Sequence, residues 1–202
     1  MRRWIEFLAC LFISPLWGQY RLTGEQVEPP KRLHFQSTTL LSPTFIRISS
    51  IAKWDSAEVD LHFLFNSQGI FWIDEKQQVA YDVTPLPQDT LPFWVEALRP
   101  TEYNGRRGLY TIFHFLAKKM EVAWDTSVAF DWGPWLRYLP AEGLGTPARY
   151  FGKGIPLYWR LYNDKGVVEN EFRLKHIEPF AATAQEGRVT YPIKKLEFER
   201  RK

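Results

Sequence analysis

Cysteine is nearly absent from this chain, since Cys10 is the only one among 202 residues. A single thiol cannot form a disulfide within the chain, and it cannot supply the several cysteines of a typical structural zinc site. The sequence also lacks a GxSxG elbow, an HExxH pair, a phosphate loop and a dinucleotide fingerprint. Its histidines are scattered at His34, His62, His114 and His176. We therefore predict no cofactor and no metal site, and the sequence leaves open whether the protein is an enzyme.

A strong net charge is missing as well, because 26 basic residues stand against 23 acidic ones and the formal net charge is +3. Proteins that bind nucleic acid usually carry a pronounced basic face, so this balance predicts no nucleic-acid partner. The local exception is a basic C-terminal tail with Lys194, Lys195, Arg200, Arg201 and Lys202. We interpret it as a solvated tail, with attraction to an anionic surface as the alternative.

Residues 1–18 have the pattern of an export signal. Arg2 and Arg3 precede an apolar run from Phe7 to Trp17, and Gly18 offers a small residue for cleavage. The run is shorter than the roughly 20 apolar residues that a membrane-spanning helix needs, so we predict no transmembrane span after cleavage. We expect an exported protein (periplasmic, cell-surface or secreted) with one β-rich domain over residues 19–202. The alternative is a buried N-terminal strand or helix of a cytosolic protein.

Aromatic residues are abundant, with nine Trp, nine Tyr and fifteen Phe, and such residues favour strands. From Ile155 to Tyr162 apolar and other residues alternate, Asn163–Gly166 has turn chemistry, and Val168, Phe172 and Leu174 resume the alternation. A period of two on both sides of a glycine-containing turn predicts a β-hairpin, with a core face of Leu157, Trp159, Leu161, Phe172 and Leu174.

A second hairpin is expected from Val59 to Ile73 around an Asn66–Gly69 turn, followed by a third strand from Val79 to Val83. Shorter strands are predicted at Arg32–Gln36, Phe45–Ile48, Glu121–Trp124, Val128–Phe130 and Val189–Tyr191. The predicted fold class is mainly β: an antiparallel sandwich or small open barrel with one or two short helices. An α+β fold is the alternative.

Three segments depart from the strand pattern. Thr90 and Pro92 predict a short helix over Leu91–Leu98. Leu109, Ile112, Phe113, Leu116 and Met120 have helical spacing, which slightly favours a helix over 109–120, although a period of two also fits. Proline and glycine interrupt residues 133–154, which we interpret as an irregular loop that is either functional or wraps the sheet.

The irregular loop also gathers aromatic and basic residues. We propose a ligand-binding set of Trp132, Trp135, Tyr138, Arg149 and Tyr150, because functional side chains concentrate in loops. The competing interpretation is that these rings plug one end of the sheets as part of the core.

Two acids near this cluster, Asp125 and Asp131, are catalytic candidates, because a carboxylate pair beside aromatic rings could hydrolyse a glycan. Both are equally at home in turns, which is the more common role of aspartate at such positions. Three hypotheses for function follow. The protein is a non-enzymatic envelope protein that binds a ligand, or a carbohydrate or protein partner, through aromatic loop residues; or it is a glycan-directed hydrolase; or it has a purely structural role in the envelope.

Overall fold

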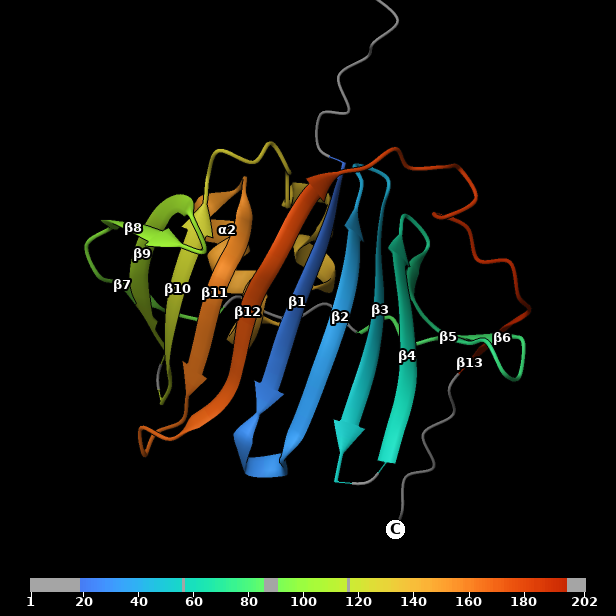
Figure 1. Ribbon diagram of the computed structural model, residues 1–202, viewed down its shortest axis with the longest axis horizontal. Coiled ribbons are helices and arrows are strands. Elements are labelled where there is room, and N and C mark those ends of the chain that lie inside the picture. The colour runs from blue at the N-terminus through green and yellow to red at the C-terminus, as the bar shows by residue number, and fades with distance from the viewer. Residues whose placement is uncertain (1–18, 56, 86–90, 116, 196–202) are drawn as a thin grey trace, which may run out of the picture.

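The computed structural model describes residues 19–55, 57–85, 91–115 and 117–195; the predicted export signal and the end of the basic tail lie outside this part of the chain. One mixed, mostly antiparallel open sheet dominates the fold (Figure 1). Its strands are β1 (Tyr20–Glu28), β2 (Leu33–Leu41), β3 (Phe45–Trp54), β4 (Ala57–Asn66), β5 (Gly69–Asp74), β6 (Val79–Asp82), β7 (Trp94–Val95), β8 (Arg99–Tyr103), β9 (Arg106–His114), β10 (Lys119–Asp125), β11 (Ile155–Tyr162), β12 (Val168–Pro179) and β13 (Ile193–Lys195).

The spatial order is β13-β6-β5-β4-β3-β2-β1-β12-β11-β10-β9-β7, and β8 also pairs with β9. Strands β1 and β12 pair antiparallel at the centre, so the first half of the chain and the second half share one sheet. Only the β13–β6 pairing is parallel among the described strands. The mainly β fold class is confirmed, as one curved open sheet and not as two stacked sheets.

Short helical turns cover one face of this sheet, which we call the concave face. They are η2 (Gly133–Tyr138), η3 (Ala141–Gly145) and the short α-helix α2 (Thr146–Phe151), and Figure 1 shows them behind the central strands. A further turn, η1 (Pro29–Lys31), links β1 to β2. The main core lies between the concave face and this covering segment, where Trp124, Phe113 and Phe130 are almost completely buried.

Both predicted hairpins are confirmed. Strands β11 and β12 pair in a register that places Trp159 opposite Phe172, and β4, β5 and β6 form the expected three-stranded meander. Strands β2, β3 and β10 contain or overlap the shorter predicted ones, but β2 and β3 run further. The strands predicted at Val128–Phe130 and Val189–Tyr191 are wrong, because both segments are irregular.

Both helix predictions are also wrong. Residues 91–98 contain only the two-residue strand β7, and residues 109–120 are divided between β9 and β10, with Leu116 outside the described part. The deciding feature is the turn at Asn104-Gly105, where both residues have positive φ (50° and 73°). This turn joins the paired residues Tyr103 and Arg106, so it starts a two-residue hairpin that continues as strand.

Candidate functional site

The concave face contains an apolar cavity of about 530 Å³. Side chains alternate between the two faces of a strand, so the paired residues Leu22, Thr39, Ile48 and Phe63 form one row across β1–β4 on this face. Neighbouring apolar walls come from both halves of the sheet: Leu41, Ile46, Leu61, Phe65, Trp159, Leu161 and Phe172. The cavity therefore depends on strands that are far apart in the sequence.

The cavity is roofed at one end, which we call the covered end, by residues Trp132, Leu139, Pro140, Gly143 and Leu144. Two hydrogen bonds fix this roof. Trp132 Nε1 donates to the carbonyl oxygen of Gly154 at 2.8 Å, and Arg137 Nη2 donates to that of Ser67, in the β4–β5 turn, at 3.3 Å. The roof thus lies over the end of the sheet where β1 and β11 begin.

At Gly154 the backbone requires glycine. Its φ is +105°, and a Cβ atom there would lie 2.4 Å from the carbonyl oxygen of Asp125 and 2.6 Å from Trp124 Nε1. The close approach lets Trp124 Nε1 donate to the carbonyl oxygen of Lys153 at 2.8 Å. This position ties the covering segment to the start of β11.

Neutral polar side chains lie toward the opposite end of the cavity, which we call the Asn170 end. Gln26, Ser37, Ser50 and Asn170 line the cavity, and none of the described residues around it is charged. Asn170 Oδ1 is buried and has no hydrogen-bond partner in the described part of the chain. Such an oxygen loses its hydration without compensation, so it marks a place where a bound donor would be favourable.

A smaller hollow of about 300 Å³ adjoins the Asn170 end and shares Leu161 and Asn170 with the cavity. Its other walls include Glu28, Lys31 and Glu169. Lys31 Nζ lies 2.7 Å from Glu28 Oε2, and Lys118 Nζ lies 3.1 Å from Glu169 Oε2. The hydrogen bond and the charge of Glu28 raise the pKa of Lys31 above its ordinary value. Charge therefore appears outside the cavity and is arranged in ion pairs.

The predicted aromatic set is divided by the structure. Trp132, Trp135 and Tyr138 are buried, with 3%, 3% and 8% of their surface exposed, and Trp132 is the member that borders the cavity. Tyr150 is 44% exposed, and its ring meets that of Phe113 edge-on. Most of these rings thus pack as the plug considered above, and ligand binding through them stays a prediction.

The two aspartates occupy structural positions. Asp125 Oδ2 accepts hydrogen bonds from Arg106 Nε and Nη2 at 2.9 and 2.7 Å. Asp125 Oδ1 accepts from the Ser127 amide at 2.9 Å and from its hydroxyl at 2.5 Å. Asp131 Oδ1 accepts from the amide of Gly133 at 2.9 Å in an exposed turn. These bonds favour turn and core roles over a catalytic pair.

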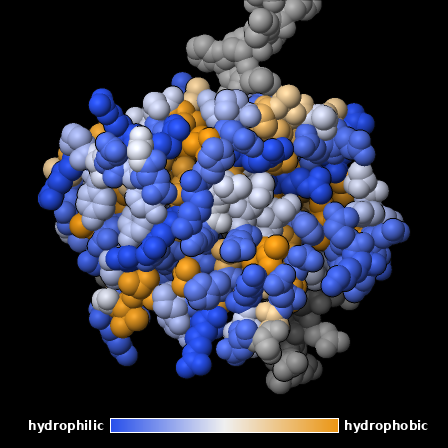
Figure 2. Space-filling model, in the orientation of Figure 1, coloured by the Kyte–Doolittle hydropathy of each residue, from blue (hydrophilic) through white to orange (hydrophobic). Residues whose placement is uncertain are grey.

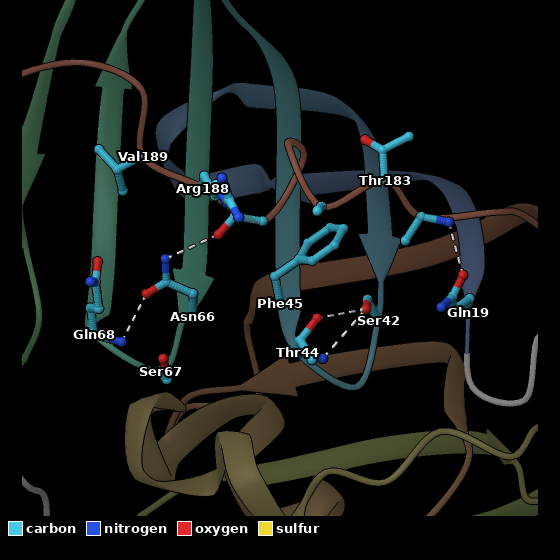
Figure 3. Close-up of a pocket in the computed structure, with 13 residues that line it drawn as sticks. Gln19, Ser42, Thr44, Phe45, Asn66, Ser67, Gln68, Thr183, Arg188 and Val189 are labelled. Carbon is cyan, nitrogen blue, oxygen red and sulfur yellow. Dashed lines mark hydrogen bonds between the residues drawn. The ribbon is translucent and has the colours of Figure 1, made fainter.

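A second pocket, of about 680 Å³, lies where residues 182–189 cross the ends of the first strands (Figure 3). Its polar groups fasten this crossing segment to the sheet. Asn66 Nδ2 donates to the carbonyl oxygen of Gly187 at 3.3 Å, and the amide of Ala182 donates to Gln19 Oε1 at 2.8 Å. Ser42 and Thr44 interact with each other through their hydroxyls at 3.3 Å. We interpret this pocket as an anchoring site.

The opposite, outer face of the sheet is largely hydrophilic, with scattered apolar residues (Figure 2). Thr23, Thr38, Ser49 and His62 form a paired row there, and His62 Nδ1 lies 3.2 Å from Ser49 Oγ. Within the described residues, no three His, Cys, Asp or Glu side chains gather as metal ligands. Every helix in that part of the chain falls short of the length and apolarity of a membrane span.

The sequence interpretation missed the cavity. In β2 every second residue faces the cavity, including Phe35, Thr39 and Leu41. The predicted strand ended at Gln36, so it left out most of these positions. Ser37 and Ser50 interrupt the apolar pattern on the inward face, which hides the true length of β2 and β3. The full length of β2 and β3 could have been recognised from the period of two, which continues through Ser37 and Ser50.

No protein-family model matches the chain, and the search of curated proteins gives no match. Among solved structures, the fold is similar to an uncharacterised conserved protein from Thermus thermophilus, with a TM-score of 0.56, 10% identity, and coverage of 94% of this chain and 97% of that one. It is also similar to MucB (TM-score 0.48, 11% identity, 90% of this chain and 60% of that one). A structure of the MucA/MucB complex of Pseudomonas aeruginosa also matches, with a TM-score of 0.49, 12% identity, and coverage of 90% of this chain and 58% of the matched chain. The Thermus likeness shows a shared fold alone.

Proposed function

We propose that the protein is an exported, non-enzymatic binding protein that holds an apolar ligand in the cavity of the concave face. The observation that supports this best is a cavity of about 530 Å³ whose described walls carry no charge. Small-molecule sites are typically concave, mostly apolar and about 300–1,000 Å³ in volume. The export part of the proposal rests on the pattern of residues 1–18.

The expected driving force is the hydrophobic effect. A ligand that loses about 300 Å² of apolar surface to the cavity gains on the order of 7 kcal/mol at about 25 cal/mol per Å². Loss of translational and rotational freedom offsets part of this gain. The surplus favours ligands with a long apolar portion over compact polar ones.

A carbohydrate or protein partner at the envelope is the alternative proposal. Tyr150, which is 44% exposed, is the loop aromatic best placed to contact such a partner. The hydrolase hypothesis has less support, because both oxygens of Asp125 already accept hydrogen bonds from Arg106 and Ser127.

Two adjacent threonines in β2 give a matched test. Thr39 lines the cavity, whereas Thr38 lies on the outer face. Binding of the neutral fluorescent probe N-phenyl-1-naphthylamine should weaken about tenfold in Thr39→Phe, which corresponds to about 1.4 kcal/mol. Thr38→Phe should bind the probe within about twofold of the parent, at the resolution of such titrations.

Equal probe affinity in Thr39→Phe and Thr38→Phe would contradict the cavity as the binding site. Thermal unfolding of both variants serves as the control for folding, and Ser37→Phe is the substitute if Thr39→Phe does not fold. The export part is tested separately by N-terminal sequencing of protein recovered outside the cytoplasm. A mature chain that begins at Gln19 is expected, and retention of Met1 would contradict export with cleavage.

A further inference from the structure

We propose that the ligand is an amphiphile with an uncharged hydroxyl or amide head group, bound with its chain at the covered end and its head at Asn170. This inference rests on the proposed function and extends it to the class and orientation of the ligand. It follows from the uneven distribution of polar groups along the cavity.

The covered end is almost wholly aliphatic or aromatic. The register places Leu41, Ile46 and Phe65 in one row, and the row with Leu22, Ile48 and Phe63 lies directly beside it. Leu139 and Leu144 close this region from the roof. A polar head group placed here would lose its hydration without a charged or amide partner, which is costly.

The other end offers hydrogen-bonding groups in consecutive rows. Ser37 and Ser50 are paired across β2 and β3, and Gln26 is paired with Phe172 and Phe35 in the next row. Asn170, opposite Leu161, stands one row further and borders both the cavity and the outer hollow. Polar side chains thus join the apolar ones toward this end, whereas the covered end has only the hydroxyl of Thr39.

Asn170 is the most specific of these groups, because its Oδ1 is buried without a partner. A hydroxyl or amide head group could donate the missing hydrogen bond to Oδ1, once the side-chain amide of Asn170 rotates about its soft terminal torsion. A carboxylate head has no proton to donate at neutral pH. The Oδ1 atom of Asn170 therefore favours a head group that carries a donor over a head group of equal size that has none.

The outer hollow adds to this discrimination. Glu28 and Glu169 border it, and each is already paired with a lysine, so an anionic head would meet two carboxylates and would have to compete for Lys31. Like charges at close range disfavour binding. An uncharged head avoids this cost, while its chain still reaches the apolar rows.

The distance between the ends suits a chain. Trp132 marks the covered end through its bond to Gly154, and Trp159 lies five residues further along the chain in β11. At about 3.3 Å per residue the two levels are at most about 16 Å apart, because the register of β11 shifts between Pro156 and Tyr158. Both indoles border the cavity, so each can report on the part of the ligand beside it.

The first experiment compares dodecanol, dodecanamide, dodecanoate and dodecane as competitors of the fluorescent probe at pH 8. Dodecanol and dodecanamide should compete at least about tenfold better than dodecanoate, equivalent to about 1.4 kcal/mol. In Asn170→Leu the advantage of dodecanol over dodecane should disappear while dodecane still binds. Glu169→Gln should raise the affinity for dodecanoate and leave the affinity for dodecane unchanged.

The second experiment reads the orientation from tryptophan quenching by dodecanol brominated near its head or at its chain end. Trp159→Phe should remove most quenching by the head-proximal bromine. Trp132→Phe should reduce quenching by the terminal bromine more than quenching by the head-proximal one, since Trp124 lies beside Trp132 and can also be quenched. The reverse pattern, or equal affinity of all head groups, would overturn this inference. If no probe of the series binds, the proposed function itself fails, so the two failures are distinguishable.

Discussion

The strongest stability prediction concerns the ion pair between Asp125 and Arg106. The Asp125 side chain is 2% exposed and that of Arg106 is 36% exposed, with Nη2 and Oδ2 2.7 Å apart. Asp125→Asn removes the charge but keeps the shape. Its NH2 group would face either the guanidinium of Arg106 or the amide of Ser127, and both of these are donors. Breaking a buried pair costs about 3–5 kcal/mol, and the partial exposure of Arg106 places the expected loss near about 3 kcal/mol.

The assay is urea unfolding at pH 7, with Asp131→Asn as the matched control. Asp131 is exposed and accepts one amide hydrogen bond, from Gly133 at 2.9 Å, which asparagine can also accept. Asp131→Asn should therefore change the free energy of unfolding by less than about 0.5 kcal/mol. If Asp125→Asn is no more destabilising than Asp131→Asn, the structural role of Asp125 is refuted.

Two further predictions test the core and the sheet. Gly154→Ala should lower the free energy of unfolding by about 3 kcal/mol in chemical unfolding, because its Cβ atom would clash with the backbone. Gly152→Ala, with open space around it, should lower it by about 1 kcal/mol. Equal losses in the two variants would contradict this packing. Partial burial alone would raise the pKa of Glu171. The hydrogen bonds from Arg160 and Arg173 outweigh this effect and lower the pKa of Glu171 below its ordinary value of 4.5. The resulting stability should be present above pH 4.5 and lost as pH falls through the lowered pKa. Glu171→Gln should thus cost about 1 kcal/mol at pH 7 and nothing under strongly acidic conditions; a cost that does not depend on pH would argue against the ion pair.

Local signals made part of the fold predictable. The β11–β12 hairpin follows from alternation on both sides of Asn163–Gly166, and its turn is held by the Asn163 side chain, whose Oδ1 accepts from the amides of Lys165 and Val167. All of this information lies within twenty residues. The meander of β4, β5 and β6 is predictable for the same reason.

Other features depend on contacts that the local sequence does not show. Residues 109–120 satisfy both helical and strand spacing, with helical spacing slightly favoured. The Asn104-Gly105 turn, together with pairing to β10, makes this segment strand. The cavity needs β1 to pair with β12, which joins residues about 150 positions apart, as Leu22 with Ile177. Pairing over such separations cannot be read from periodicity.

The roles of the candidate site residues also depend on the fold. Loop aromatics such as Trp132 and Trp135 can be identified as important, but only the fold decides that both are buried and that Trp132 packs against Phe130 and Trp124. Asn170 has no sequence signal at all, since it is an ordinary polar residue of a hairpin. Its interest arises from an oxygen that the fold buries without a partner.

The most direct test of the proposed cavity is anomalous diffraction from crystals soaked in a terminally brominated dodecanol. We predict one bromine peak between the concave face and the roof, near Leu22, Phe63 and Leu144, with the hydroxyl within hydrogen-bonding distance of Asn170. Bromine confined to the outer face of the sheet, with the cavity filled only by water, would contradict the account.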